Sequence, residues 1–207
     1  MKTEKNKPRL ILASESSRRK ELLEQAGLIF KVIPSSIDEN SVDHTEPDTL
    51  VKALAEAKAK NVAAAFPGSW VIGADTIVLV GGNILGKPSS TEAARQMIQR
   101  LNGRAHDVFT GYAICCEALN TCIIGVEKTE VYFKSLRESE IEWYIQTDEP
   151  YDKAGGYAIQ GLGSFLVKRI SGSYTNVVGL PVCEVLDHLF KMGVLEPDRA
   201  GHWRLCQ

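Results

Sequence analysis

The sequence predicts an α/β protein, because strand and helix signals alternate through its first half. An apolar run at Leu10–Ala13 leads into a helical pattern that ends at Gly27, and a β-branched run follows at Ile29–Ile33. The segment Trp70–Val80 is apolar nearly throughout, as expected for a strand covered on both faces. With 207 residues, the chain is long enough for one large domain, or two closely joined lobes, around a hydrophobic core.

Hydroxyl residues introduce the first predicted helix. Ser14, Ser16 and Ser17 stand where N-caps are preferred, and Arg18 and Arg19 fall in the first turn. The free N–H groups of a helix start attract anions, and guanidinium groups bind phosphate oxygens in pairs. The segment therefore indicates a polyphosphate site. By residue type alone, an ordinary surface helix with solvated arginines is an equally good interpretation.

The remaining elements follow in order from turns, caps and periodicity. An acidic loop over 34–47 precedes an alanine-rich helix over 48–66. A tight turn at 81–83 returns the chain into a short strand at 84–85. Two helices are expected to begin with capping boxes, at Ser89–Glu92 and at Ser135–Glu138. The last predicted elements are a hairpin of 106–116 with 121–133, a strand near 164–170 and an amphipathic helix over 181–192.

Composition excludes several classes of function. The chain has 24 Lys and Arg against 26 Asp and Glu, so no overall positive field draws it to nucleic acid or anionic lipid. Its start is charged and polar, and no later segment has the length of a membrane span, so we expect a cytoplasmic protein. The five cysteines form an odd set without a C-x-x-C pair, which argues against a disulfide framework and a structural zinc site.

The segment Gly81–Lys87 matches the P-loop pattern G-x-x-x-x-G-K after a strand. Pro88 follows, however, where a P-loop needs a hydroxyl for magnesium and a backbone N–H for phosphate. A lysine before proline is also disfavoured in helical geometry, whereas the P-loop lysine begins a helix. We therefore reject a P-loop and keep Lys87 as a point charge that can contact phosphate at a strand end.

Asp75 interrupts the most apolar predicted strand. A lone carboxylate there costs on the order of several kcal/mol unless it is paired, hydrogen-bonded or bound to a metal, so a structural salt bridge stays open as its role. Asp38 and Glu39 add hard oxygen ligands of the kind that Mg²⁺ or Mn²⁺ takes alongside substrate phosphates. Together with the two arginines and with Lys58 and Lys87, these acids favour hydrolysis of a phosphoanhydride.

The segment Asp148–Gly163 is rich in glycine and too apolar for an ordinary loop. Within it, Gln160 carries an amide that offers both a donor and an acceptor to a pyrimidine edge. A structural loop whose Asp152–Lys153 pair is only surface charge remains the alternative.

Taken in order from Leu10 to about Leu189, these blocks resemble the Maf family of nucleoside triphosphate pyrophosphatases. The matching blocks are Ala13–Arg19, Gly73–Val78, Gly86–Pro88, Leu101–Gly103, Val108–Gly111, Glu149–Tyr157, Ile159–Gly161 and Asn176–Pro181. The resemblance implies a Maf/ITPase-like fold, in which a mixed, twisted sheet has flanking helices and a cleft lies between two lobes. It also implies a single domain over 1–207, with residues 1–8 as a flexible N-terminal extension, and hydrolysis of a nucleoside triphosphate to the monophosphate and pyrophosphate.

The resemblance further implies roles for individual residues. Asp75 matches the proposed general base and Glu39 an acidic position near the metal; base and metal-ligand roles for Asp75 are not separated. The phosphate-contacting basic residues match Arg19, Lys58 and Lys87, and the positions that distinguish substrate subfamilies match Arg18, Thr76 and Gln160. Two positions depart from the family pattern, with Ser17 where proline is usual and Ala158 where glycine is common.

This combination is similar to the branch of the family that cleaves dTTP and UTP, whereas the branch acting on 7-methyl-GTP has other residues at these positions. We therefore expect a hydrolase of phosphoric anhydrides that uses Mg²⁺ or Mn²⁺ and acts on canonical or modified pyrimidine triphosphates. We expect no nucleic-acid or membrane partner, and a homodimer is compatible with the resemblance. Two alternatives stay open: an inosine/xanthosine-type triphosphatase, and a non-catalytic nucleotide-sensing regulator of cell division.

Overall fold

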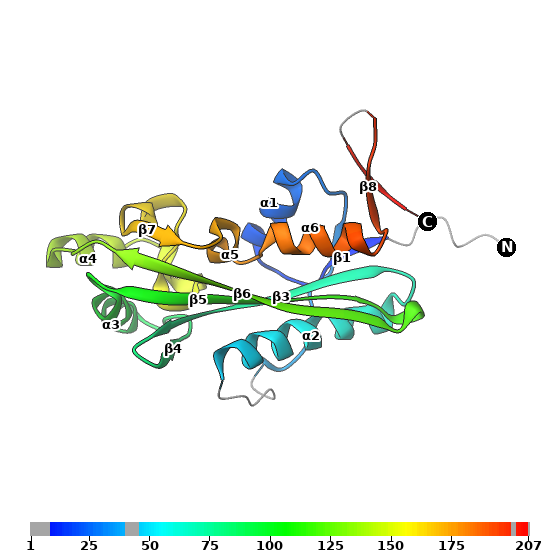
Figure 1. The fold of residues 1–207 in the computed structure, drawn as a ribbon. Coiled ribbons are helices and arrows are strands. Elements are labelled where there is room, and N and C mark those ends of the chain that lie inside the picture. Colours follow the sequence, from blue (N-terminus) through cyan, green and yellow to red (C-terminus); the bar gives the residue numbers. More distant parts are fainter. Residues whose placement is uncertain (1–8, 40–45, 200–201, 207) are drawn as a thin grey trace. The chain divides into compact units, whose positions relative to one another are not determined.

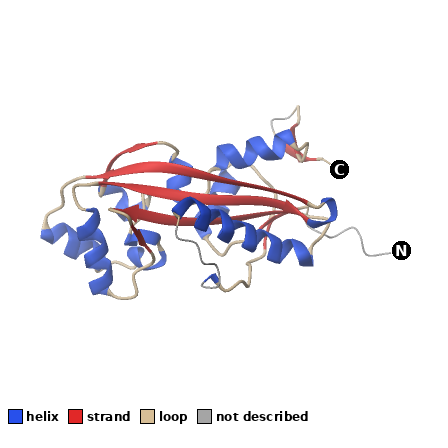
Figure 2. Cartoon of the chain, turned by 60° about the horizontal axis from the view of Figure 1, so that its bottom comes forward, coloured by secondary structure: helices blue, strands red, loops and turns tan. Residues whose placement is uncertain are grey.

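The computed structural model describes residues 9–39, 46–199 and 202–206, so the expected extension at 1–8 lies outside the described residues. The chain folds into two compact units, each built from separate stretches of sequence. Figures 1 and 2 show its helices and strands. Unit 1 contains the described residues of Met1–Asp75, Gly111–Val126 and Gly179–Gln207. Unit 2 contains Thr76–Thr110 and Glu127–Val178. Three long strands each contribute residues to both units.

The strands form a seven-stranded mixed sheet in the order β2-β1-β3-β5-β6-β7, with β4 paired to β3. The strand β1 (Leu10–Leu12) runs parallel to β2 (Lys31–Val32) and β3 (Trp70–Val80). Antiparallel pairs join β4 (Asn83–Leu85) to β3 and β7 (Val167–Ser171) to β6 (Thr121–Phe133). The predicted hairpin of β5 (Ala105–Cys116) and β6 is present, with a short 3₁₀ turn, η2 (Glu117–Leu119), between them. The predicted mixed α/β fold is confirmed.

In unit 1, helices cover both faces of the sheet. The helix α2 (Pro47–Ala65) lies on one side of the strands, and α1 (Ser17–Gln25) and α6 (Val182–Lys191) lie on the other (Figure 1). Neighbouring residues of β5 mark the two faces: Gly111 meets the backbone of α2, whereas the ring of Tyr112 lies 5.9 Å from the ring of His188 on α6. A second, two-stranded sheet of β8 (Leu195–Pro197) and β9 (Trp203–Leu205) follows α6.

The contact between α2 and the sheet depends on two glycines. A Cβ added at Gly73 in β3 would lie 2.3 Å from the carbonyl oxygen of Ala55, and one at Gly111 would lie 2.2 Å from that of Val51. Both acceptors belong to the backbone of α2, which cannot move aside as a flexible side chain could. The alanines of α2 complete the close approach, since Ala55 and Ala59 are fully buried. This is the packing reason for the alanine-rich composition of the helix.

Unit 2 encloses its own hydrophobic core. It contains α3 (Thr91–Leu101), α4 (Glu138–Ile145) and α5 (Tyr174–Val178), and the short 3₁₀ segments η3 (Glu149–Asp152), η4 (Ala154–Gly156) and η5 (Gly161–Phe165). Arg95 of α3 donates to Glu142 of α4 at 2.5 and 2.8 Å and so ties the two helices together. Across the described residues of both units, no helix is long and apolar enough to span a membrane.

Three local predictions were wrong in detail. The cap of α3 is Ser90, which accepts from the N–H of Ala93 at 3.1 Å, so the helix begins one residue later than expected. At α4 the N-cap is Arg137, whose backbone N–H donates to Glu140 at 2.8 Å, in place of the expected box of Ser135 and Glu138. In each case several hydroxyl and acidic residues stand close together, and tertiary packing selects among them. The strand predicted near 164–170 begins only at Val167, because η5 occupies the preceding residues.

The argument against disulfide bonds from the number and spacing of the cysteines was also wrong. Cys115 at the end of β5 and Cys122 at the start of β6 form a disulfide, with their Cα atoms 4.0 Å apart. The two residues face each other across a hairpin, a spatial relation that cysteine count and C-x-x-C spacing do not reveal. Among the described residues, Cys116, Cys183 and Cys206 are free.

A buried histidine sits at the centre of unit 2. The Nε2 atom of His106 lies 2.6 Å from the hydroxyl oxygen of Tyr157, and its ring meets those of Phe133 and Tyr157 edge to face. His106 is only 3% exposed, and its Nδ1 atom has no hydrogen-bond partner. Burial lowers the pKa of His106 to about 4, opposed by the nearby charge of Asp107. The folded protein therefore holds this imidazole in its neutral form.

This histidine makes stability fall on mild acidification. Below pH 6.5 the unfolded chain binds a proton at His106, whereas the folded chain does not until about pH 4. The free energy of unfolding should therefore fall by up to about 3 kcal/mol between these pH values, at 1.36 kcal/mol per pH unit. Urea unfolding across this range should show a smaller loss for His106→Gln. Parallel pH profiles for the two proteins would contradict the assignment.

The close approach of α2 predicts that Gly73→Ala is destabilising. The added methyl group has to push the backbone of α2 away from β3, at an overpacking cost of about 1 to 3 kcal/mol. Gly68→Ala is the matched control, since a Cβ at Gly68 meets no atom within 4 Å. Urea unfolding should therefore separate the two variants, and equal stabilities would show that α2 does not lie against Gly73.

Candidate active site

The centre of the candidate site is a lysine held by two carboxylates in unit 1. The Nζ atom of Lys58 lies 2.6 Å from Oδ1 of Asp75 and 2.8 Å from Oε1 of Glu39. The side chains of Lys58 and Asp75 are 9% and 13% exposed, whereas that of Glu39 is 58% exposed. The cluster thus runs from the protein interior to the solvent. The salt bridge that the sequence analysis kept as one possible role for Asp75 is therefore present, and its lysine also pairs with Glu39.

The sheet and α2 dictate why Lys58 meets Asp75. Side chains two residues apart on a strand point to the same face, so Asp75 shares the face of Gly73. That face is where α2 passes, with the backbone N of Ala59 2.7 Å from the Cβ position of Gly73. Lys58 precedes Ala59 in the helix. Because glycine brings helix and strand so close, the lysine side chain reaches the carboxylate while remaining buried.

The start of α1 supplies a second cation. Ser16 caps the helix, its hydroxyl accepting from the N–H of Arg19 at 3.4 Å. The hydroxyl of Ser14 accepts from Nη1 of Arg19 at 3.1 Å, and the carbonyl of Gly179 accepts from its Nε at 2.8 Å. The guanidinium is therefore fixed by protein groups on two sides, which is more order than a solvated surface arginine would have.

Arg19 belongs electrostatically to the same cluster. Burial lowers its pKa, and the charge of Arg18 lowers it further, whereas the charges of Asp75 and Glu39 raise it. In unit 1, Lys58 thus pairs with Glu39 and Asp75, Arg19 lies within electrostatic reach of both carboxylates, and Arg18 precedes Arg19 in the helix; Asp38 is exposed.

Unit 2 places Thr76 through a network of buried hydroxyl and amide groups. The Oγ1 atom of Thr76 lies 2.9 Å from that of Thr110, which donates to the carbonyl of Asn176 at 3.0 Å. The side-chain amide of Asn176 in turn donates to Thr129 at 2.9 Å and to the carbonyl of Val108 at 3.2 Å. Thr110, Thr129 and Asn176 are fully buried. The network fixes the position of Thr76 at the point where β3 enters unit 2.

The other two predicted residues of unit 2 lie in different segments. Lys87 is exposed between β4 and α3, and no helix begins at it, consistent with the rejected P-loop. Gln160 is half-buried and caps η5 with an extended backbone. Neither side chain makes an ion pair or hydrogen bond to another described residue. The cleft expected between the two lobes, and any approach of these residues to Asp75, stay predictions.

Several contributors were not assigned roles from the sequence. Ser14 was considered only as a helix cap, yet it holds Arg19, and Gly179 does so through its carbonyl. Thr110 and Asn176 lie within blocks that resemble the family but were given no role, and Thr129 was not singled out. A usable signal was present for them, because buried polar residues inside apolar strands need partners, as was argued for Asp75.

The carboxylates of Glu39 and Asp75 are candidate ligands for a divalent cation. Among the described residues, no three His, Cys, Asp or Glu side chains cluster so as to hold a metal ion. Glu39 and Asp75 nevertheless both reach one cationic centre, the Nζ atom of Lys58. Magnesium is commonly held by one or two carboxylates, with waters and substrate phosphates completing the shell. Two carboxylates beside cations suit such a shared site and do not suit an all-protein metal cage.

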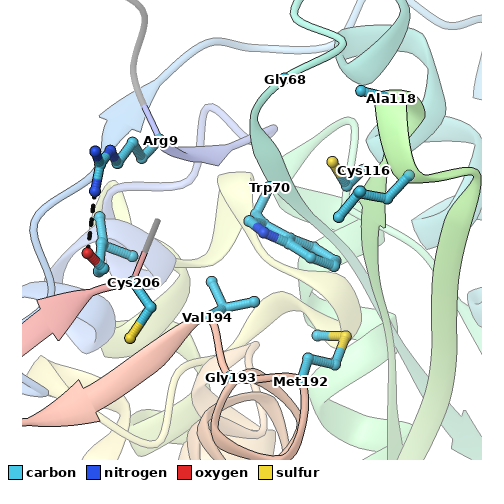
Figure 3. A pocket seen from close by; sticks show the side chains of 11 residues that line it. Arg9, Gly68, Trp70, Cys116, Ala118, Met192, Gly193, Val194 and Cys206 are labelled. Atoms are coloured by element: carbon cyan, nitrogen blue, oxygen red, sulfur yellow. Dashed lines mark hydrogen bonds between the residues drawn. The ribbon is translucent and has the colours of Figure 1, made fainter.

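The pocket in Figure 3 is separate from this cluster. It encloses about 630 Å³ in unit 1, between β1, the end of β5 and the β8–β9 hairpin, and none of the predicted site residues lines it. Trp70, Met192 and Val194 form apolar walls, and Arg9 donates to the carbonyl of Leu205 at 3.1 Å across its edge (Figure 3). Its lining offers neither a carboxylate nor a cluster of cations for phosphate chemistry.

The fold and the charged cluster define a mixed α/β protein in which the interior of a strand and of a helix bring together a carboxylate and a lysine, with an arginine held at a helix start. Comparison with known sequences agrees: residues 9–192 match the model of the Maf-like proteins, and the chain belongs to this family. A dTTP/UTP pyrophosphatase of Syntrophus aciditrophicus is 48% identical over 187 residues, covering 90% of this chain and 91% of that protein. One of Geotalea uraniireducens is 47% identical over 190 residues, covering 92% and 98%.

A partial likeness to a solved structure is more remote. The HAM1 protein from Coxiella burnetii aligns with a TM-score of 0.42 and 19% sequence identity, covering 60% of this chain and 72% of that one. A likeness of this size adds nothing to the fold described above.

The buried ion pair predicts that Lys58→Met is strongly destabilising. Methionine is unbranched and only one atom shorter than lysine, but it leaves the largely buried carboxylate of Asp75 without its partner, at a cost of about 3 kcal/mol. Lys60→Met is the matched control on the same helix, because Lys60 is exposed and its pair with Glu56 lies in solvent. That change should cost less than about 1 kcal/mol. Urea unfolding of both variants checks the difference, and similar losses would contradict it.

Proposed function

We propose that this protein hydrolyses dTTP and UTP to the monophosphate and pyrophosphate. The observation that carries the proposal is the cluster of Asp75, Lys58, Glu39 and Arg19 in unit 1, on a chain of the Maf family. Relatives about 47% identical over some nine-tenths of the chain bear the name dTTP/UTP pyrophosphatase, which supports the choice of substrate. The cluster offers a carboxylate for proton transfer and cations for phosphate charge.

In this mechanism a water molecule attacks the α-phosphorus and the bond to the bridging oxygen of pyrophosphate breaks. Asp75 orients the water and takes its proton, a role open to its second carboxylate oxygen because Lys58 engages Oδ1. Lys58 and Arg19 offset the negative charge that develops on the phosphate oxygens. A divalent cation, held by Glu39 and Asp75 with the substrate phosphates, would supply further charge neutralisation. Lys87 is proposed as an additional phosphate contact.

Base selection is assigned to unit 2. A uracil or thymine edge presents carbonyl acceptors and one N–H donor, and a single amide satisfies one of each. Gln160 carries such an amide with no competing bond to a described residue, and Thr76 offers a hydroxyl fixed by Thr110. Arg18, which belongs to unit 1, is kept as a proposed substrate contact on the strength of the resemblance alone. The homodimer that the resemblance allows stays a prediction.

A substrate panel tests the proposal. The purified chain is assayed with dTTP, UTP, CTP, ITP and 7-methyl-GTP in Mg²⁺ or Mn²⁺, and monophosphate and pyrophosphate are quantified. We expect the highest kcat/KM for dTTP and UTP, with equal amounts of the two products. A preference for ITP would favour the inosine/xanthosine alternative. Tight triphosphate binding without turnover in either metal would favour a nucleotide-sensing regulator.

Asp75→Asn should reduce turnover by at least about 100-fold, since a positioned general base contributes roughly 10² to 10⁴ to the rate. The change preserves side-chain size and removes the charge that can accept a proton. Asp107→Asn is the matched control, because Asp107 also lies on a strand and pairs with a lysine, Lys128, at 2.9 Å. The control should keep near-native kcat. Near-native kcat in a folded Asp75→Asn protein would exclude the catalytic role.

A further inference from the structure

The loop that carries Gln160 is clamped by one carboxylate. In unit 2, Oε2 of Glu149 accepts from the backbone N–H of Leu162 at 2.9 Å, and Oε1 accepts from that of Gly163 at 2.6 Å. These two N–H groups belong to the first turn of η5, where helical backbone donors lack partners within the helix. Glu149 therefore supplies, from elsewhere in the chain, the acceptors that the start of η5 requires.

Tyr144 extends the clamp to the other side of Gln160. Its hydroxyl donates to Oε1 of Glu149 at 2.9 Å and accepts from the N–H of Ala158 at 3.3 Å. Tyr144 is fully buried in α4, so this bridge is anchored in the core of unit 2. The backbone N–H groups of Leu162 and Gly163 are thus held by Glu149 directly, and that of Ala158 is held through Tyr144. These groups lie on both sides of Gln160.

Glu149 is itself held in place. Its backbone carbonyl accepts from Nζ of Lys153 at 2.7 Å, and the following Pro150 is buried. One interpretation of the sequence was that Asp152 and Lys153 are only a surface ion pair. Lys153 also has a structural role, because it holds Glu149, which in turn holds the Gln160 loop. Glu149 is thus held by hydrogen bonds at both its backbone and its side chain, which restricts its movement.

Glycines allow the loop to approach this carboxylate so closely. Gly161 adopts φ +63°, and a Cβ there would lie 2.5 Å from Oε2 of Glu149. A Cβ at Gly163 would lie 2.4 Å from the carbonyl oxygen of Ala158 and 2.7 Å from the hydroxyl of Tyr144. The glycines that follow Gln160 thus leave room for Glu149 and Tyr144. The contacts that they allow hold the backbone that carries the Gln160 side chain.

We propose that Glu149 is a positioning residue for base recognition: it fixes the backbone around Gln160 so that the amide meets the pyrimidine edge in one orientation. This inference rests on the base-reading role proposed above for Gln160. Glu149 acts through the loop and has no part in the chemical step. Its loss should therefore change the preference for UTP over CTP, whose bases differ at the edge that an amide reads, more than it changes the common phosphate chemistry.

The test compares kcat/KM for UTP and CTP in the full chain, at a temperature well below unfolding. Glu149→Gln keeps the shape of the side chain, but its amide nitrogen cannot accept from a backbone N–H, so one contact to the start of η5 is lost. We expect the UTP-to-CTP ratio to fall about 10-fold, the scale of one mismatched buried polar contact. Tyr144→Phe should lower the ratio in the same direction.

Glu140→Gln is the matched control. Glu140 also caps a helix start, accepting from the N–H of Arg137 at 2.8 Å, and it pairs with Lys134 at 2.7 Å. It lies at the start of α4, and its hydrogen bonds to described residues go to Arg137 and Lys134, outside the Gln160 loop. Its substitution should lower the melting temperature through the lost cap while leaving the UTP-to-CTP ratio within twofold of wild type.

A double-mutant cycle with Gln160→Ala separates positioning from general destabilisation. If Glu149 acts through Gln160, Glu149→Gln should leave the ratio unchanged once Gln160 is alanine. The inference is overturned if Glu149→Gln lowers only the melting temperature, or if the two substitutions lower the ratio independently. Should Glu149→Gln fail to fold, Tyr144→Phe in the same cycle decides the matter. Absence of a preference for UTP over CTP in the wild-type protein would instead refute the proposed base selection, before any variant is measured.

Discussion

The close contact between α2 and the bare backbone of β3 at Gly73 is the constraint on which the candidate site depends. With no side chain at that position, Ala55 and Ala59 bring the helix against the strand, and Lys58 arrives beside Asp75 while remaining buried. Neither charge would be stable there alone, because an unpaired ion in a protein interior loses its hydration without compensation. Packing and electrostatics therefore determine each other at this point of the fold.

The charges around Asp75 also form a gradient from the interior to the solvent. The buried Lys58 pairs with the carboxylate of Asp75, and the exposed Glu39 pairs with the same lysine. Arg19 is fixed at a helix start by Ser14 and Gly179. Such an arrangement keeps the cations ordered before a polyanion arrives. Preorganised charge is effective in catalysis because little reorganisation is needed as the reaction proceeds.

Unit 2 orders its polar groups by a different means. Buried hydroxyls and amides connect Thr76 to Thr110 and Asn176, and one carboxylate with its tyrosine partner connects the backbone on both sides of Gln160. Hydrogen bonds are directional, so these networks specify orientation more sharply than apolar packing does. Such defined orientation suits the base-reading role proposed for Thr76 and Gln160.

The sequence by itself determined the fold class, most strands and helices as far as α6, and the residues that carry charge, but it did not indicate α5 or the β8–β9 sheet. A continuous apolar run located β3 and an alanine-rich composition located α2, each within a residue of the observed bounds, and the break in β3 at Asp75 marked a carboxylate that needs a partner. These features are local, and local patterns are legible along one chain. Sequence reasoning did not foresee the Cys115–Cys122 disulfide, the choice of Ser90 over Ser89 as a cap, or the anchoring roles of Thr110 and Glu149. Only the tertiary structure decided these, because each depends on which backbone or side-chain groups from distant segments come within hydrogen-bonding or bonding distance.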